Sequence, residues 1–293
     1  MSDAGTPQVD KSRELKLRIA SAAVIGPAAL VLTWWGGVPF ALLIVVCAAL
    51  MMSEWTTIVM GPSRDPLRLG QLALVAAAVA VAAFLGRFGL PVIHTISTVI
   101  AGLGVASALS MREARQQASG DDARRWAPWG ALYAALPPIA LVSLRDAPAG
   151  SWLILYLFAV VWTTDIAAFF AGRAIGGPKL WERVSPKKTW SGAIGGTLGA
   201  VVAGLLVAHF AGAARLGPVL GVTIVLSIAS QAGDLFESAL KRRFGVKDSG
   251  RLIPGHGGIL DRVDGLVAAA VAAVVIATLH GGVANPTAGL LHW

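Results

Sequence analysis

The sequence is poor in charged residues and has a single cysteine. Charged residues make up 14% of its 293 residues, hydrophobic residues make up 56%, and the mean hydropathy is +0.70. A soluble globular domain has roughly a quarter of its residues charged, so this composition excludes an ordinary water-soluble fold. The lone Cys47 lies in an apolar run, which excludes a disulfide within the chain and favours a packing role.

The long apolar runs lack the alternating polarity of membrane barrel strands, so helices are the expected form. Most runs reach the roughly 20 residues that cross a hydrocarbon core. We predict an all-α, polytopic integral membrane protein with about nine transmembrane helices, which begin near Leu17, Val38, Leu69, Pro91, Trp126, Ser151, Gly192, Gly217 and Gly265. The first run lacks a small-residue cleavage site, so no cleavable signal is predicted.

Positive charge falls on one side of these predicted spans. With nine spans, 21 of the 24 Lys and Arg residues lie on the side of the amino terminus, and Arg87, Arg145 and Arg215 lie on the other. Because short cytoplasmic loops carry an excess of Lys and Arg, we predict a multi-pass protein of the cell (plasma or inner) membrane with a cytoplasmic amino terminus. The net charge of +8 needs no nucleic-acid partner, and none is predicted.

Polar residues divide the chain into two regions. Residues 1–150 carry few polar residues inside their spans and are predicted to be a transmembrane scaffold with a basic cytoplasmic amino terminus. Residues 151–293 place acidic side chains inside or at the ends of spans and carry two basic loops rich in Gly and Pro. Ionisable residues are costly in a membrane and usually functional, so we place the active site in this second, catalytic region, on the cytoplasmic side.

The segment 238–264 combines basic residues, three Asp and a glycine turn. Glycines allow backbone amides to approach a phosphate closely, and carboxylates suit Mg²⁺, so the segment favours a polyphosphate site. Asp261 and Asp264 lie on one helix face if the final span begins here. The alternative is a basic cytoplasmic loop in which the glycines only end or interrupt helices. It explains neither the Asp residues nor the His-Gly-Gly turn.

Three earlier segments carry similar chemistry. Asp165 and Asp234 lie inside or at the end of apolar spans, where an unpaired carboxylate is expensive. For Glu237 two interpretations stay open: a functional role, or an ion pair with Lys241, which is four residues further along the chain. The basic run from Ser185 to Thr189 precedes a predicted helix, whose amino terminus favours anions, and a capped basic loop is the alternative there.

The segment 238–264 resembles the signature of the phosphatidate cytidylyltransferase family at every fixed position. That signature has Ser238, Lys241-Arg242, Lys247-Asp248, Pro-x-His-Gly-Gly and Asp-Arg-x-Asp at the same spacing. The run 185–192 resembles the family's Ser-Pro-Lys-Lys-Thr-Trp-Glu-Gly element, with Ser191 in place of Glu. The run 165–173 resembles its D-x-x-A-Y-x-x-G-R element, with Phe169 in place of Tyr. The strong resemblance covers about 151–264.

The resemblance implies transfer of CMP from CTP to phosphatidic acid, with pyrophosphate leaving, in a homodimer within the bilayer. It implies that Asp234 and Asp261 bind metal, to which we add Asp264, with Mg²⁺ alone or with a second cation as the cofactor. We expect catalytic roles for Asp234, Asp261, Lys241 and Arg242. We expect substrate contacts from Asp165, Ser185, Lys187, Lys188, Thr189, Ser238, Lys247, Asp248, Gly255, His256, Gly257, Gly258 and Arg262.

Three alternatives remain at this stage. A CTP-dependent lipid kinase would release CDP instead of pyrophosphate, and an archaeal-type cytidylyltransferase would use an ether lipid. A transporter could line an ion path with Asp165 and Asp234 but leaves the loop signature unexplained.

The predicted orientation can be tested by cysteine labelling in a Cys47→Ala background. Single cysteines at positions 183 and 247 should resist a membrane-impermeant thiol reagent in intact cells and react once the membrane is opened, because both lie in basic loops. Labelling of either position from outside would contradict the orientation.

Overall fold

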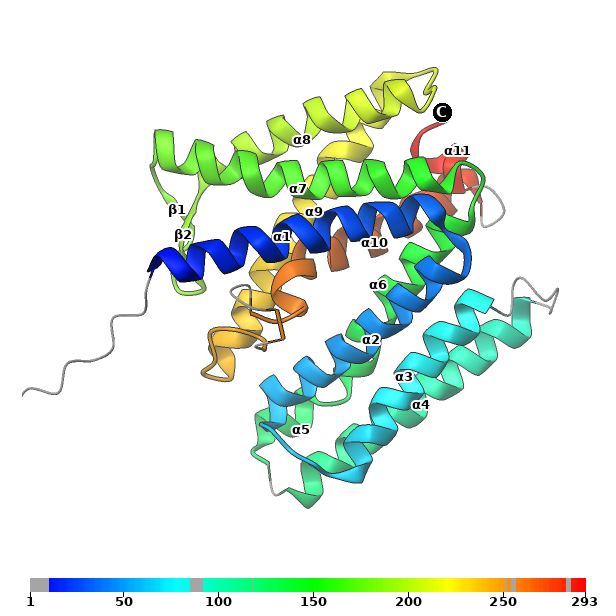
Figure 1. Ribbon diagram of the computed structural model, residues 1–293, viewed down its shortest axis with the longest axis vertical. Helices are drawn as coiled ribbons and strands as arrows, with labels where there is room; N and C mark the ends of the chain where they lie inside the picture. Colours follow the sequence, from blue (N-terminus) through cyan, green and yellow to red (C-terminus); the bar gives the residue numbers. More distant parts are fainter. Residues whose placement is uncertain (1–10, 85–91, 118, 251, 254–256, 283–285) are drawn as a thin grey trace, which may run out of the picture.

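The computed structural model describes residues 11–84, 92–117, 119–250, 252–253, 257–282 and 286–293. These residues form helices and one small hairpin (Figure 1). The elements run in the order α1 Lys11–Trp35, α2 Gly37–Met60, α3 Pro66–Phe84, α4 Val92–Gln116, α5 Asp121–Trp126, α6 Trp129–Asp146, α7 Gly150–Ile175, β1 Lys179–Trp181, β2 Ser185–Thr189, α8 Trp190–Phe210, α9 Leu216–Arg243, α10 Leu260–Gly281 and α11 Pro286–Leu290.

Seven helical segments of the described chain are long and apolar enough to cross a membrane. They are α2, α3, α5 with α6, α7, α8, α9 and α10. The polytopic helical fold is therefore confirmed, whereas the count of nine spans is not. The helices α1 and α4, of 25 residues each, occupy the positions of the other two predicted spans.

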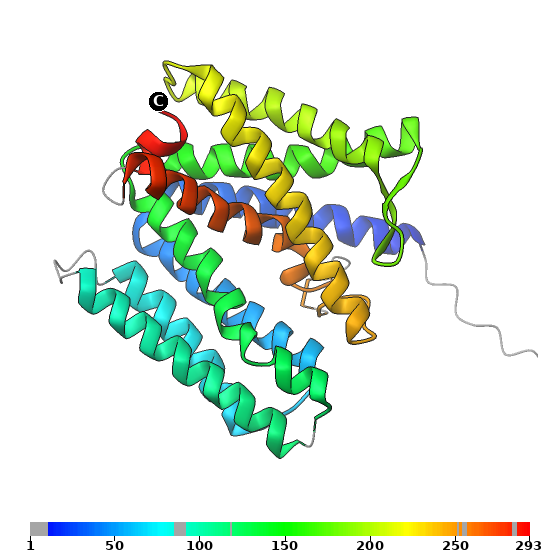
Figure 2. The ribbon, with the colours of Figure 1, turned by 180° about the vertical axis from the view of Figure 1, so that it is seen from behind.

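The helices form two groups that α10 joins. In one group α2 packs against α3 and α6, and α3 packs against α4; in the other α7 packs against α8 and both contact α9 (Figures 1 and 2). The helix α10 contacts α6, α7 and α9. This central position brings residues at its start close to both groups.

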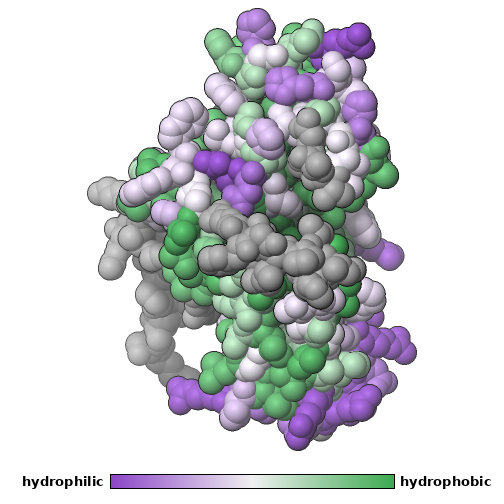
Figure 3. Space-filling view, turned by 90° about the vertical axis from the view of Figure 1, so that its right-hand side faces the viewer, coloured by the Kyte–Doolittle hydropathy of each residue, from purple (hydrophilic) through white to green (hydrophobic). Residues whose placement is uncertain are grey.

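Large hydrophobic side chains remain exposed on the outer helices. On α8 these are Leu198, Val202, Leu206 and Phe210, four residues apart along one face. Figure 3 shows broad hydrophobic areas on the surface beside hydrophilic clusters toward the top and bottom of the view. An exposed apolar face of this extent suits contact with lipid.

The small hairpin departs from the all-α prediction. Strand β2 pairs antiparallel with β1, with Thr189 opposite Lys179 and Ser185 opposite Trp181. The helix predicted after the basic run does begin there, since the Thr189 side chain caps α8 by accepting from the Gly192 N–H at 3.1 Å. Backbone pairing across a short turn, which a basic and proline-containing run does not signal, therefore holds the lysines of β2 in place.

Helices α7 and α8 approach closely along a line of glycines. A side chain at Gly196 would place its Cβ 2.7 Å from the Thr164 carbonyl oxygen, and one at Gly195 would lie 2.3 Å from the Ala171 Cβ. Small residues at such spacing let two membrane helices pack backbone to backbone. The glycine seam therefore fixes the position of the hairpin that connects these helices.

We expect Gly196→Leu to lower the unfolding temperature in detergent, because overpacking a tight contact costs roughly 1–3 kcal/mol. The control is Gly221→Leu on α9, which changes the same residue type in a helix but has no atom within 4 Å of the new Cβ. Equal shifts for the two variants would contradict a packing role for the seam.

Candidate active site

The predicted site residues come together where β2, the end of α9 and the start of α10 meet. Lys188, at the end of β2, forms an ion pair with Asp234 on α9. The Ser238 hydroxyl, one turn further along α9, donates to the other Asp234 oxygen at 3.4 Å. Two segments that are 46 residues apart in sequence are thus joined through opposite charges.

A second ion pair joins α9 to α10. The Lys241 ammonium lies 2.5 Å from a carboxylate oxygen of Glu237 and 2.6 Å from Oδ1 of Asp261. The Lys241 side chain is only 12% exposed. The pairing of Glu237 with Lys241, which the sequence left open, is therefore present, and Lys241 also binds a carboxylate on another helix.

Asp261 accepts three more hydrogen bonds on its other oxygen. The donors are the Ser249 N–H, the Ser249 hydroxyl and the Gly258 N–H, each at 2.9 Å from Oδ2. Gly257 has a φ of +85°, and a Cβ there would lie 2.7 Å from Asp261 Oδ2. Glycine is therefore required at 257 both by the backbone and by the approach of this carboxylate.

The amides expected to face a phosphate have partners within the chain. The Gly258 N–H donates to Asp261, and the Gly257 N–H donates to the Ile253 carbonyl at 3.1 Å. Of the other predicted contacts, Gly255 and His256 lie outside the described residues. The glycine turn shapes the loop around Asp261 in this structure.

Further carboxylates lie near these pairs. Asp264 interacts electrostatically with Asp234, Glu237 and Asp165, and Asp165 also interacts with Lys188 and Arg262. The Asp165 side chain is exposed to a cavity instead of being buried against a partner. The carboxylates predicted from three separate motifs thus form one acidic cluster within the helices.

The remaining charged candidates lie at the protein surface. Lys187, Arg242, Lys247 and Arg262 are exposed, as is Asp248. Ser185 begins β2 and is partly buried. These side chains are available to a ligand, whereas Lys188 and Lys241 are held by carboxylates.

Sequence reasoning left out Glu54, which the structure brings to this site. Its carboxylate accepts from the Ser249 hydroxyl, the Ile259 N–H and the Leu260 N–H, each at 2.8 Å. In the sequence, Glu54 and Trp55 lie near the end of an apolar span. A charged residue at the membrane interface would show the same pattern, so the pattern does not indicate a role in the site. No local pattern reveals a contact across 195 residues.

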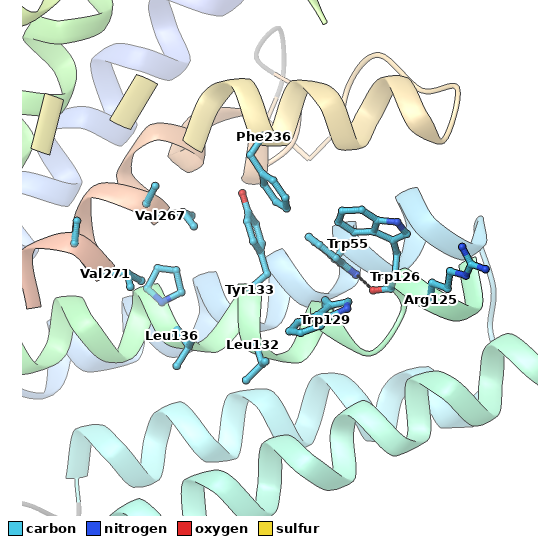
Figure 4. Close-up of a pocket in the computed structure, with 13 residues that line it drawn as sticks. Trp55, Arg125, Trp126, Trp129, Leu132, Tyr133, Leu136, Phe236, Val267 and Val271 are labelled. Carbon is cyan, nitrogen blue, oxygen red and sulfur yellow. Dashed lines mark hydrogen bonds between the residues drawn. The ribbon is translucent and has the colours of Figure 1, made fainter. Parts of the chain in front are cut away.

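An aromatic cavity of about 790 Å³ borders the acidic cluster between α6 and the helices α9 and α10 (Figure 4). Its aromatic lining includes Trp55, Trp126, Trp129, Tyr133 and Phe236. The Tyr133 ring lies 5.6 Å from that of Phe236, and its hydroxyl points toward α10. A second, apolar cavity of about 600 Å³ lies among α1, α2, α6, α7 and α10.

The apolar cavity ends at charged residues of the site. Its walls are mainly aliphatic and aromatic side chains, and its charged lining residues are Asp165 and Arg262. An amphiphile with an apolar body and a charged end matches this distribution.

Family comparisons agree with this arrangement. The cytidylyltransferase family model matches residues 16–280, and the chain belongs to this family. The phosphatidate cytidylyltransferase of Brucella suis biovar 1 is 46% identical over 258 residues, which cover 87% of this chain and 90% of that protein. Proteins of the same name from Haemophilus influenzae and Staphylococcus aureus (strain COL) are each 49% identical, over 43% and 39% of this chain and 45% of their own length.

Proposed function

We propose that this protein transfers CMP from CTP to phosphatidic acid and releases pyrophosphate, leaving CDP-diacylglycerol in the membrane. The observation that carries the proposal is the junction of a charged cluster with an apolar cavity inside a chain of the cytidylyltransferase family. A nucleotide and a lipid phosphate both need cations, and only the lipid needs an apolar compartment. The names of the relatives support the same activity.

The lipid would enter the apolar cavity with its phosphate near Arg262. Acyl chains suit the aliphatic walls, and the arginine that lines the charged end suits an anionic headgroup. The CTP phosphates would lie against the exposed Lys187, Arg242 and Lys247 on the water side. The lipid phosphate is largely ionised near pH 7, so it can attack the α-phosphorus in line without a general base.

We propose a divalent cation at the acidic cluster. Five carboxyl groups (Asp165, Asp234, Glu237, Asp261 and Asp264) lie near three cationic side chains (Lys188, Lys241 and Arg262), so acidic groups outnumber basic ones by two. The buried Ser230 hydroxyl has no hydrogen-bond partner among the described residues. Oxygen donors and this excess of acidic groups suit Mg²⁺, which would neutralise charge on the phosphates when bound.

The geometry favours some predicted ligands over others. Among the described residues no three acidic, histidine or cysteine side chains converge as a ready metal site. Both Asp261 oxygens already accept from protein donors, whereas Asp264 lies among Asp165, Asp234 and Glu237. Both Asp234 oxygens are likewise occupied, by Lys188 and Ser238, whereas Asp264 accepts on Oδ1 from the Gly265 N–H. We therefore assign the cation first to Asp264, while the roles of Asp234 and Asp261 as ligands stay predictions.

We propose that this site faces the cytoplasm of the cell membrane. The hairpin, the end of α9 and the start of α10 carry most of the basic residues of the second half, and these segments lie at the same end of their helices. Arg145, at the opposite end, donates to the Thr33 carbonyl oxygen at 2.5 Å and so caps α1. A homodimer also remains part of the proposal.

The activity is tested with purified protein, phosphatidic acid and labelled CTP, with Mg²⁺ and with a chelator. We expect CDP-diacylglycerol and pyrophosphate with Mg²⁺ only, and loss of at least ~10²-fold in rate for Asp234→Asn and Asp261→Asn, because single electrostatic deletions cost this much. Release of CDP would identify a kinase. Wild-type rates for both variants would contradict the assigned carboxylates.

Lys188→Ala should lower kcat/KM for CTP by ~10-fold or more, since it removes a cation from the charge cluster. Ser191→Glu serves as the matched change in the same run, and we expect it to be tolerated, because the family usually has Glu there. Steady-state kinetics on both variants decide the point. Small, equal effects would mean that the lysines of β2 belong to a merely basic loop.

A further inference from the structure

Glu54 is a buried carboxylate from the first half of the chain that contacts the loop and helix carrying Asp261. Glu54 is 8% exposed. Oε1 accepts from the Ile259 N–H, and Oε2 accepts from the Leu260 N–H and the Ser249 hydroxyl. It therefore caps α10 from another helix, where the helix's own sequence supplies no side-chain cap.

Two partners of Glu54 are backbone N–H groups, which can only donate, and the third is the Ser249 hydroxyl, whose single proton is shared with Asp261. The two backbone N–H groups bind different oxygens of the carboxylate. A glutamine side chain has one oxygen only, so its amide nitrogen would face a second donor and leave a buried group unpaired. The hydrogen bonds at this position therefore favour a carboxylate over an amide.

The surrounding loop is built for the close approach of this carboxylate. A Cβ at Gly258 would lie 2.5 Å from Glu54 Oε2, and one at Gly250 would lie 2.8 Å from Oε1. Both glycines belong to the segment between α9 and α10. Neither glycine has a positive φ, so close contacts and not backbone conformation explain them: Glu54 at Gly250, and both Ser249 Oγ at 2.1 Å and Glu54 at Gly258.

The neighbouring Trp55 fixes the end of α2 from the other side. Its indole Nε1 donates to the Trp126 carbonyl oxygen at 3.3 Å, and its ring lies 4.9 Å from that of Tyr133 (Figure 4). Gly130 makes room for it, because a Cβ there would lie 2.4 Å from the Trp55 ring. The backbone that carries Glu54 is thus held by the scaffold.

The Ser249 hydroxyl lies between Glu54 and Asp261. It is 2.8 Å from the Glu54 carboxylate and 2.9 Å from the Asp261 carboxylate, and Ser249 is 3% exposed. From this arrangement we infer that Glu54 is a positioning residue for cytidylyl transfer, which holds Asp261 in place through Ser249 and the start of α10. This inference rests on the proposed function and adds to it a role for the amino-terminal half.

We test the inference with Glu54→Gln, compared with Glu113→Gln. Glu113 is also buried in the first half and also accepts several side-chain hydrogen bonds, from Arg68, Gln71 and Gln117, but none from the site. Glu54→Gln should lower kcat by ~10-fold or more, because small misplacements of a reactive group are costly. Glu113→Gln should lower the unfolding temperature and leave kcat and KM unchanged.

Hydrogen exchange reports the contact without requiring turnover. Peptides covering 257–264 should exchange faster in Glu54→Gln than in the wild-type protein and Glu113→Gln. The reason is that the substitution disturbs the carboxylate that accepts from the Ile259 and Leu260 N–H groups. If exchange rises as expected but the wild-type protein makes no CDP-diacylglycerol, the positioning contact stands and the proposed function fails.

Ser249→Ala provides the second variant, and it decides the matter if Glu54→Gln does not fold. Removing the shared hydroxyl should lower kcat. The double variant Glu54→Gln/Ser249→Ala should lose less in kcat than the two single losses combined, because both substitutions act through one contact. The inference is overturned if both single variants keep the wild-type kcat, or if Glu54→Gln changes only the unfolding temperature as Glu113→Gln does.

Discussion

The Lys241 ammonium group lies between two carboxylates, Glu237 on its own helix and Asp261 at the start of α10. Three charges in a poorly solvated place are tolerated only as a set, since removing one partner of a buried pair costs about 3–5 kcal/mol. The set fixes α10 against α9, and Gly233 permits this approach because a Cβ there would lie 2.5 Å from the Asp264 carbonyl oxygen. The position of Asp261, and with it the positions of the loop before α10 and of the acidic cluster, depends on this contact.

The sequence was most informative where several charged residues and glycines lie close together in the chain. It was least informative where residues far apart in the chain contact each other. Asp234 could be chosen because a carboxylate at the end of an apolar span is costly and usually functional. Lys241 and Asp261 could be chosen because the segment 238–264 combines basic, acidic and glycine residues and resembles the family signature. Glu54 could not be distinguished from an interfacial charge, because its partners lie about two hundred residues away. The β1–β2 hairpin was missed because backbone pairing, and not side-chain alternation, holds its few residues.

Hydropathy gave the helical class but not the number of spans. The two predicted spans that are not among the seven are α1, of which Ala23–Trp35 is a shorter apolar helix, and α4, whose last turns carry Arg112, Glu113 and Arg115. The division of the chain at residue 150 into scaffold and catalytic region describes where polar residues lie. As a division into domains it stays a prediction, and α10 contacts α6 on one side of it and α7 and α9 on the other.

The glycine seam between α7 and α8 also affects the charged residues of the site. Asp165 stands on α7 and Lys188 on the strand that leads into α8, so their separation is set by how closely two backbones approach at Gly192 and Gly196. Any larger residue in the seam would change the spacing of charges a helical turn or more away. The spacing of the site's charges therefore depends on glycines whose own role is to let two backbones meet.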